Sequence, residues 1–60
     1  MKTHLTKLVN TGKQFTLFFV NGYQMLCTLL DFDDDALTVK DTKTGHQQLI
    51  FIHAVSTINL

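Results

Sequence analysis

The chain has no proline, tryptophan, arginine or glutamate, and only one cysteine in 60 residues. With the single thiol of Cys27, no disulfide can form within the chain, and such cysteine usage is typical of a reducing compartment. The N-terminal residues lack the apolar core of a secretion signal, and no stretch approaches the roughly 18 apolar residues of a membrane span. We therefore expect a cytoplasmic protein with no membrane segment.

The charge is balanced, with five lysines against five acidic residues, all of them aspartate. A neutral chain lacks the bulk attraction to phosphate that drives duplex DNA binding. The missing arginine removes the usual bidentate contact to phosphate and guanine. We therefore expect no specific duplex DNA binding. Any nucleic-acid binding must depend on base stacking, polar contacts to base edges and backbone amides.

The short length limits how much stability one chain can supply. Residues 1–60 make a single domain, and a chain of this size buries only about 60% of its unfolded surface. Small folds usually gain stability from disulfides, a metal or partner subunits. The histidines, at positions 4, 46 and 53, are too scattered for a zinc site, and we expect no metal and no cofactor. Composition alone therefore favours a homo-oligomer.

The first predicted element is a short helix over residues 3–10. One apolar stripe is formed by Leu5, Leu8 and Val9. Thr3 is the candidate N-cap, and Gly12 follows the helix at the position where glycine commonly ends one. A helix of about two turns is not stable alone in water, so it must pack on the rest of the fold.

The residue composition of the rest of the chain is typical of β-strands. Strands are predicted at 14–20, 23–32, 36–40, 46–52 and 55–60. Asn21-Gly22 is a strong hairpin signal between the first two strands and predicts a type I′ turn. One helix before five short strands indicates a mainly β fold, a small and strongly bent antiparallel barrel.

The fourth predicted strand is apolar on both faces, from Leu49 to Ile52. An antiparallel strand with one solvent-exposed face should alternate apolar and polar residues. An exposed edge strand that is apolar on both faces promotes aggregation. A second copy of the chain would resolve the conflict by pairing its fifth strand with this edge. Head-to-tail pairing of that kind closes into a ring when the rotation between copies closes.

Four segments, in their order and spacing, resemble the Sm motif, and most closely its bacterial branch, the Hfq family of RNA chaperones. The segments are Phe18 to Met25, Phe32-Asp33, Gln47 to Phe51 and His53 to Thr57. With the helix, the resemblance covers about residues 3–59. It implies an Sm-like (LSm) ring that binds single-stranded RNA in post-transcriptional regulation, with no catalysis. The resemblance implies a hexamer. A pentamer or heptamer would need only a small change in the angle between neighbouring subunits.

The resemblance implies a distal face, opposite the helix, that binds A-rich or purine-rich RNA. Phe18 stands where family members carry a Tyr or Phe that stacks on purines, and Gln48 offers a donor and an acceptor to a base edge. The remaining family positions on this face are Gly22, Tyr23, Gln24, Met25 and Thr57, with Phe19 beside them. The alternative is that the aromatics are core or hairpin side chains. We favour that alternative for Phe19 and leave it open for Phe18 and Tyr23.

A second family site, for uridine, lies at the pore on the helix-bearing, proximal face. His53 matches the family histidine, and Phe51 matches its aromatic neighbour without the phenol. Ile52 replaces the family lysine, and Asp34-Asp35 replaces a Gln-Phe pair. The pocket thus loses a cation and gains carboxylates that repel phosphate, so we expect a weakened site. The alternative for His53 is a capping residue that fixes the strand bend.

Other chemistry-bearing residues are assigned structural roles. Lys13 is the only basic residue of 9–13, where annealing family members often carry arginines, so we expect weak annealing. The aspartates at 31 and 33–35 lack the glycine and glutamate of a calcium loop and read as a solvated turn. Cys27 is expected to be a small buried residue.

The sequence therefore predicts an RNA-binding ring with a distal purine-binding face, and no enzyme. The alternative is a ring-forming structural or protein-interaction module with little or no RNA binding. Neutral charge and the replacements in the proximal pocket favour that alternative.

Overall fold

The backbone follows the predicted order of one helix and five strands. The computed structural model describes residues 2–60. Its elements are α1 (Lys2–Thr11), β1 (Gln14–Phe19), β2 (Gln24–Phe32), β3 (Ala36–Asp41), β4 (Gln47–Phe51), the short 3₁₀ helix η1 (Ile52–Ala54) and β5 (Val55–Asn59). The helix begins one residue before Thr3, so the prediction of Thr3 as its N-cap is wrong. No helix in the described part of the chain is long and apolar enough to cross a membrane.

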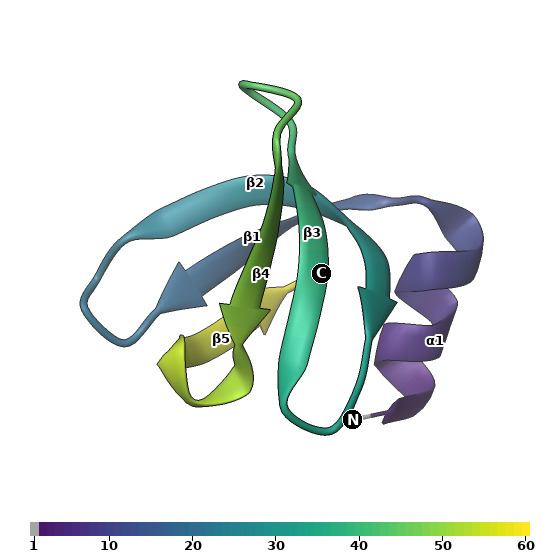
Figure 1. Cartoon of the computed structure of the whole chain (residues 1–60), viewed down its shortest axis with the longest axis horizontal. Coiled ribbons are helices and arrows are strands. Elements are labelled where there is room, and N and C mark those ends of the chain that lie inside the picture. Colours follow the sequence, from purple (N-terminus) through teal and green to yellow (C-terminus); the bar gives the residue numbers. More distant parts are fainter. Residues whose placement is uncertain (1) are drawn as a thin grey trace.

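The five strands form one antiparallel sheet in the order β4-β3-β2-β1-β5. Figure 1 shows β2 arching over the molecule, with α1 at one side and the β3–β4 hairpin protruding at the top. The register shifts between Leu29 and Asp31 in β2 and between Phe18 and Phe19 in β1. Such irregularities bend a strand and increase its twist. The sheet therefore curves as predicted, and β4 and β5 are left as its two edges.

The core lies inside this curve. Its most completely buried side chains are Leu17, Leu29, Leu37, Val39 and Cys27. Leu5 and Leu8 of α1 are 3% and 5% exposed and join the same cluster. Burying one aliphatic side chain of this size stabilises the fold by about 1.5–3 kcal/mol. The apolar stripe of α1 therefore packs on the sheet, and Gly12, whose N–H donates to the Leu8 carbonyl (3.1 Å), ends the helix with φ +63°.

The β1–β2 hairpin differs from the predicted type I′ turn. Val20, Asn21 and Gly22 form a three-residue loop, closed by hydrogen bonds from Phe19 N–H to the Tyr23 carbonyl (2.8 Å) and from Gly22 N–H to the Phe19 carbonyl (3.0 Å). Only Gly22 has positive φ (90°), and Asn21 does not. Three-residue hairpin loops place glycine at the left-handed position after an ordinary turn, which removes the demand for positive φ at the asparagine.

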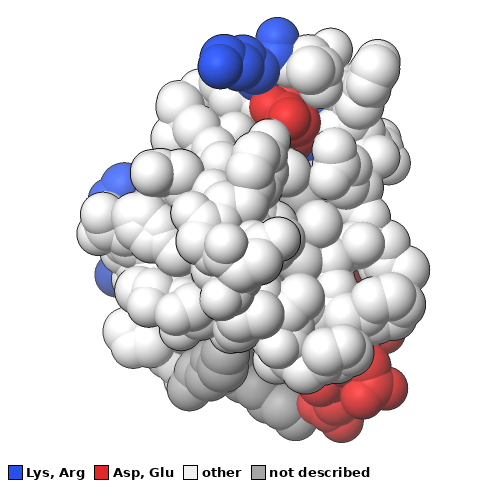
Figure 2. Space-filling model, turned by 90° about the vertical axis from the view of Figure 1, so that its left-hand side faces the viewer, with Lys and Arg blue, Asp and Glu red and all other residues white. Residues whose placement is uncertain are grey.

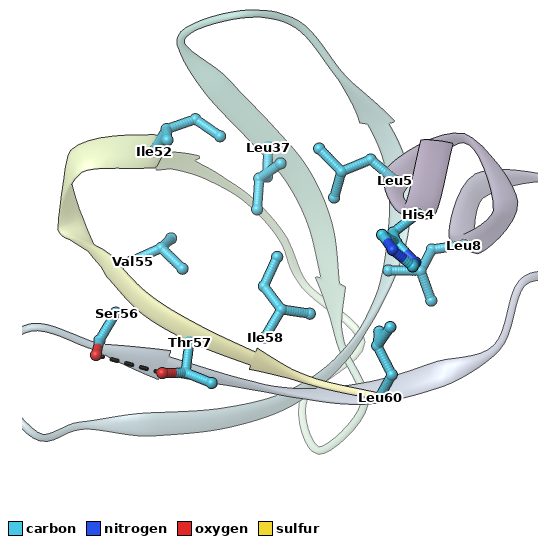
Figure 3. A pocket seen from close by; sticks show the side chains of 10 residues that line it. All are labelled: His4, Leu5, Leu8, Leu37, Ile52, Val55, Ser56, Thr57, Ile58 and Leu60. Carbon is cyan, nitrogen blue, oxygen red and sulfur yellow. Dashed lines mark hydrogen bonds between the residues drawn. The ribbon is translucent and has the colours of Figure 1, made fainter. Parts of the chain in front are cut away.

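A hollow of about 240 Å³ remains between α1, β3 and β5, where the barrel is open (Figure 3). Side chains that point into it are Leu5, Leu8, Leu37, Ile52, Val55, Ile58 and Leu60. His4 and the hydroxyls of Ser56 and Thr57 lie at its margin, with Ser56 Oγ 3.5 Å from Thr57 Oγ1.

Candidate nucleic-acid interface

Three of the predicted distal residues form a row across three neighbouring strands. Phe18 on β1 pairs with Gln24 on β2 and with Thr57 on β5. Directly opposed residues of antiparallel strands project from the same face, so the three side chains stand side by side. Leu17, the residue before Phe18 on β1, is fully buried, so the row lies on the outer face of the sheet. Phe18 is half-buried, while Gln24 and Thr57 are exposed.

A further aromatic ring follows the hairpin loop, on the residue that is hydrogen-bonded to Phe19. Tyr23 follows Gly22 and is 60% exposed. Its ring centroid lies 5.7 Å from that of Phe19, with the planes tilted by 52°. Phe19 itself is half-buried and packs on the core, in line with the structural role favoured for it. The exposed aromatic surface at the hairpin therefore comes from Tyr23, whose ring contacts that of Phe19.

Two predicted distal residues lie apart from this row. Met25 pairs with Leu17, faces the core and is 7% exposed, so its side chain is not part of the outer surface. Gln48 is exposed on β4, at the opposite edge of the sheet from Thr57. Within one chain, β3 and β2 separate it from Phe18 on β1.

The predicted proximal residues form a separate cluster at the β4–β5 corner. The Phe51 and His53 rings are stacked, with centroids 6.0 Å apart and planes within 10° of parallel, and both are exposed. Ile52 between them turns into the hollow, and its N–H donates to the Asp35 carbonyl at 2.8 Å. That hydrogen bond fixes the acidic turn against the corner that carries His53.

The acidic turn is built around Asp33. Its Oδ1 accepts hydrogen bonds from the backbone N–H groups of Asp35 (2.7 Å) and Ala36 (2.8 Å). These two bonds hold the pKa of Asp33 below its ordinary value. No three His, Cys, Asp or Glu side chains in residues 2–60 are grouped to hold a metal ion. The turn is thus a set of exposed negative charges beside the Phe51–His53 pair.

Cys27 lies in the core, fully buried. Burial, and to a smaller extent the charge of Asp41, raises the pKa of its thiol to about 11. A protonated, inaccessible thiol is unreactive, and the prediction of a small buried residue is confirmed.

One exposed group escaped the sequence prediction. Leu26 follows the alternation of β2 onto the outer face, where it is 47% exposed beside the β3–β4 loop residues Thr42 and Lys43. The period-two pattern of β2 could have located Leu26. The approach of the loop depends on a long-range backbone contact that no local pattern reveals.

The sequence model of the Hfq protein family matches residues 2–60. This chain belongs to the Hfq family. The Hfq family consists of Sm-like RNA-binding proteins and not of enzymes, so the predicted family and the absence of catalysis are confirmed. The helix followed by a bent five-stranded sheet is the fold that this family predicts.

Individual Hfq proteins give the same result. The RNA-binding protein Hfq of Geobacillus sp. (strain WCH70) is 43% identical over 53 residues, covering 88% of this chain and 69% of that protein. The RNA-binding protein Hfq of Bradyrhizobium sp. (strain ORS 278) is 36% identical over 56 residues, covering 93% of this chain and 66% of that protein. This chain thus spans about two thirds of the length of these Hfq relatives.

A crystal structure of Hfq, described as a pleiotropic translational regulator, superimposes with a TM-score of 0.92 at 29% sequence identity. The match covers 98% of this chain and 95% of the other. The Hfq fold therefore extends over the described chain, with no element left over.

Proposed function

We propose that this chain assembles into a homo-oligomeric ring, most simply a hexamer, that binds A-rich or purine-rich single-stranded RNA on its distal face. The ring would act in the cytoplasm as an RNA chaperone in translational and other post-transcriptional regulation. The proximal uridine site would be weakened. The observation that carries the proposal is the outward row of Phe18, Gln24 and Thr57, because it combines a stacking ring with an amide and a hydroxyl.

The open edges of the sheet support the ring. Leu49 on β4 is 61% exposed, an apolar surface that a second copy would cover. Neither β4 nor β5 has a second strand partner within residues 2–60. Pairing β4 of one copy with β5 of the next would also bring the strand that carries Gln48 next to the strand that carries Thr57. Both copies would then contribute residues near the subunit boundary.

The electrostatics of the β4–β5 corner support a weakened proximal site. The exposed Asp33 and Asp35 belong to the turn that is hydrogen-bonded to this corner through the Ile52 N–H, and Ile52 supplies no cation. Like charge opposes the approach of a phosphate backbone, and no counterion release from a lysine compensates at this position. Stacking on Phe51 remains available but lacks an electrostatic anchor.

Titration of the assembled protein with labelled oligoadenylate and oligouridylate tests the proposal by fluorescence anisotropy in moderate salt. Phe18→Leu keeps apolar bulk but removes the flat ring, so oligoadenylate affinity should fall by the equivalent of about 1–3 kcal/mol per stacked base. Phe18→Tyr should retain binding. Phe51→Leu makes the same change at the other cluster and should leave oligoadenylate affinity unchanged. Retained affinity in Phe18→Leu would contradict distal stacking.

The second candidate is a ring-forming structural or protein-interaction module. It is favoured by the zero net charge and by the acidic turn at the proximal corner. If neither oligonucleotide binds the wild-type ring at low micromolar concentration, this candidate replaces the RNA proposal. Sedimentation equilibrium tests the ring itself, since a folded monomer at dilute concentration would remove the basis of both candidates.

A further inference from the structure

The hollow between α1, β3 and β5 continues into a groove along α1. His4, Leu8 and Leu60 line both spaces, and Figure 3 shows these three side chains together at one side of the hollow. The groove encloses about 210 Å³. Its remaining walls are formed by Lys7, Thr11 and Lys13. The hollow and the groove therefore make one elongated site, with an apolar end and a cationic end.

The hollow can hold an apolar group of limited size. Its volume of about 240 Å³ exceeds the roughly 150 Å³ of an engineered apolar cavity that binds benzene. Leu5 and Leu37, 3% and 0% exposed, are among the most buried residues of its lining. No polar side chain is buried in the described part of the chain, so the inner surface of the hollow gives water no side-chain partner. A short alkyl chain suits such a space.

The groove offers positive charge to the other end of the same ligand. Lys7 and Lys13 are exposed, and His4 adds a ring N–H donor at the junction. None of the five aspartates, all of which lie in the described chain, lines the groove or the hollow. On the face drawn in Figure 2, red atoms gather chiefly at the lower right and beside blue atoms at the top. An anionic group in the groove would thus meet cations without an adjoining aspartate in the lining.

The end of α1 weakens this attraction. A helix C-terminus carries about half a negative charge, which is less than the charge of two lysines. The Lys7 carbonyl already accepts a hydrogen bond from Thr11 Oγ1 (2.9 Å). The Leu8 carbonyl accepts one from the Gly12 N–H (3.1 Å). Because both lysines are exposed, salt screens their field. The anionic group should therefore add modestly to affinity, and most of the affinity should come from the buried alkyl chain.

We propose that this site binds one free medium-chain fatty acid, with its alkyl chain in the hollow and its carboxylate near Lys7 and Lys13. An uncharged apolar molecule would use only the hollow, and a small anion only the groove. Ile58, which lines the hollow, pairs with the buried Leu17 and so lies on the opposite face of the sheet from Phe18. The site is therefore separate from the proposed distal face and does not depend on RNA binding.

Calorimetric titration of the assembled protein with sodium butanoate, hexanoate, octanoate and decanoate tests the site. Affinity should rise by about fourfold for each methylene that becomes buried, and should level off once the hollow is filled. In NMR spectra, octanoate should shift the amide resonances of Leu8 and Ile58. The amide resonance of Lys40, on β3 outside both linings, should stay in place.

Three variants separate the two ends of the site. Leu5→Phe adds bulk to a side chain that points into the hollow, so octanoate affinity should fall by about tenfold or more, as if two methylenes lost their place. Lys7→Gln should lower octanoate affinity by about two- to fivefold at low salt and leave the affinity for uncharged 1-octanol unchanged. Lys43→Gln is the matched control, because it removes the same charge from the β3–β4 loop and should change neither affinity.

A second copy of the chain is the rival occupant, because the hollow borders the open edge of β5. If no fatty acid binds the assembled protein, the fatty-acid proposal is wrong, whatever the result with oligoadenylate. Octanoate binding that Leu5→Phe leaves unchanged, or that does not shift Leu8 and Ile58, would also overturn it. Should Leu5→Phe fail to fold, Lys7→Gln decides: a loss for octanoate alone supports the site, and any other pattern overturns it.

Discussion

The outward row at Phe18 and the corner at His53 each join an aromatic ring to a polar side chain, yet their surroundings differ. The row lies on the exposed surface of three paired strands, with no carboxylate among its members. The corner is hydrogen-bonded to the acidic turn through Ile52 and Asp35. Similar stacking surfaces can therefore have opposite tendencies toward an RNA backbone, because local charge decides whether a phosphate is tolerated.

The largest effect should come from breaking the proposed subunit boundary, on which the comparison of the two regions depends. Leu49→Asp puts a charge on the exposed edge of β4, where the single chain leaves the side chain 61% exposed. The chain should keep its circular dichroism spectrum, while its sedimenting mass falls to that of small species and oligoadenylate binding is lost. Leu49→Met is the conservative control. An unchanged assembly mass would show that this edge is not an interface.

A smaller effect should come from making the corner resemble the family site. Ile52→Lys together with Asp34→Asn and Asp35→Asn restores a cation and removes two carboxylates. Oligouridylate affinity should rise, by a few-fold for each favourable charge change at low salt, and the gain should shrink as salt is added. Anisotropy titrations at two salt concentrations measure it. If the triple variant binds oligouridylate no better than wild type, charge is not what weakens the corner.

The acidic turn should also give the corner a dependence on pH that the row lacks. The pKa of Asp33 is lowered in the folded chain from its ordinary 3.8, so its stabilisation is present above that value and is lost as pH falls toward the folded pKa. Asp33→Asn keeps an oxygen acceptor but cannot titrate. Urea unfolding from pH 6 to pH 2 should show a steeper loss of stability in wild type than in Asp33→Asn.

The smallest effect is expected at Cys27, which lies in the core and belongs to neither region. Because the pKa of its buried thiol is about 11, a thiol-reactive reagent at pH 8 should leave the native protein unmodified. Reaction should appear only after unfolding in denaturant, as mass spectrometry would record. Rapid modification of the native protein would indicate an opening of the sheet around β2.

Much of this molecule could be predicted from short-range patterns. Runs of aromatic, β-branched and other apolar residues located all five strands, and Gly12 marked the helix end. The alternation along β2 could also have shown that Met25 faces the core with Leu17, a point that the family resemblance obscured. The loop at Gly22 was predicted one residue too short, since Asn-Gly fits more than one hairpin geometry. The approach of the β3–β4 loop to Leu26, through the Thr42 N–H, depends on packing between distant segments.

The unpaired margins of the sheet have a practical consequence. Each copy carries two edges with unpaired backbone N–H and C=O groups, on β4 and on β5. A short synthetic peptide that copies residues 55–60 should therefore dock on β4 without supplying the β4 edge of a further copy. Such a peptide would act as a chain stopper. It would convert the proposed rings into shorter, open oligomers in proportion to its concentration, without any substitution in the protein.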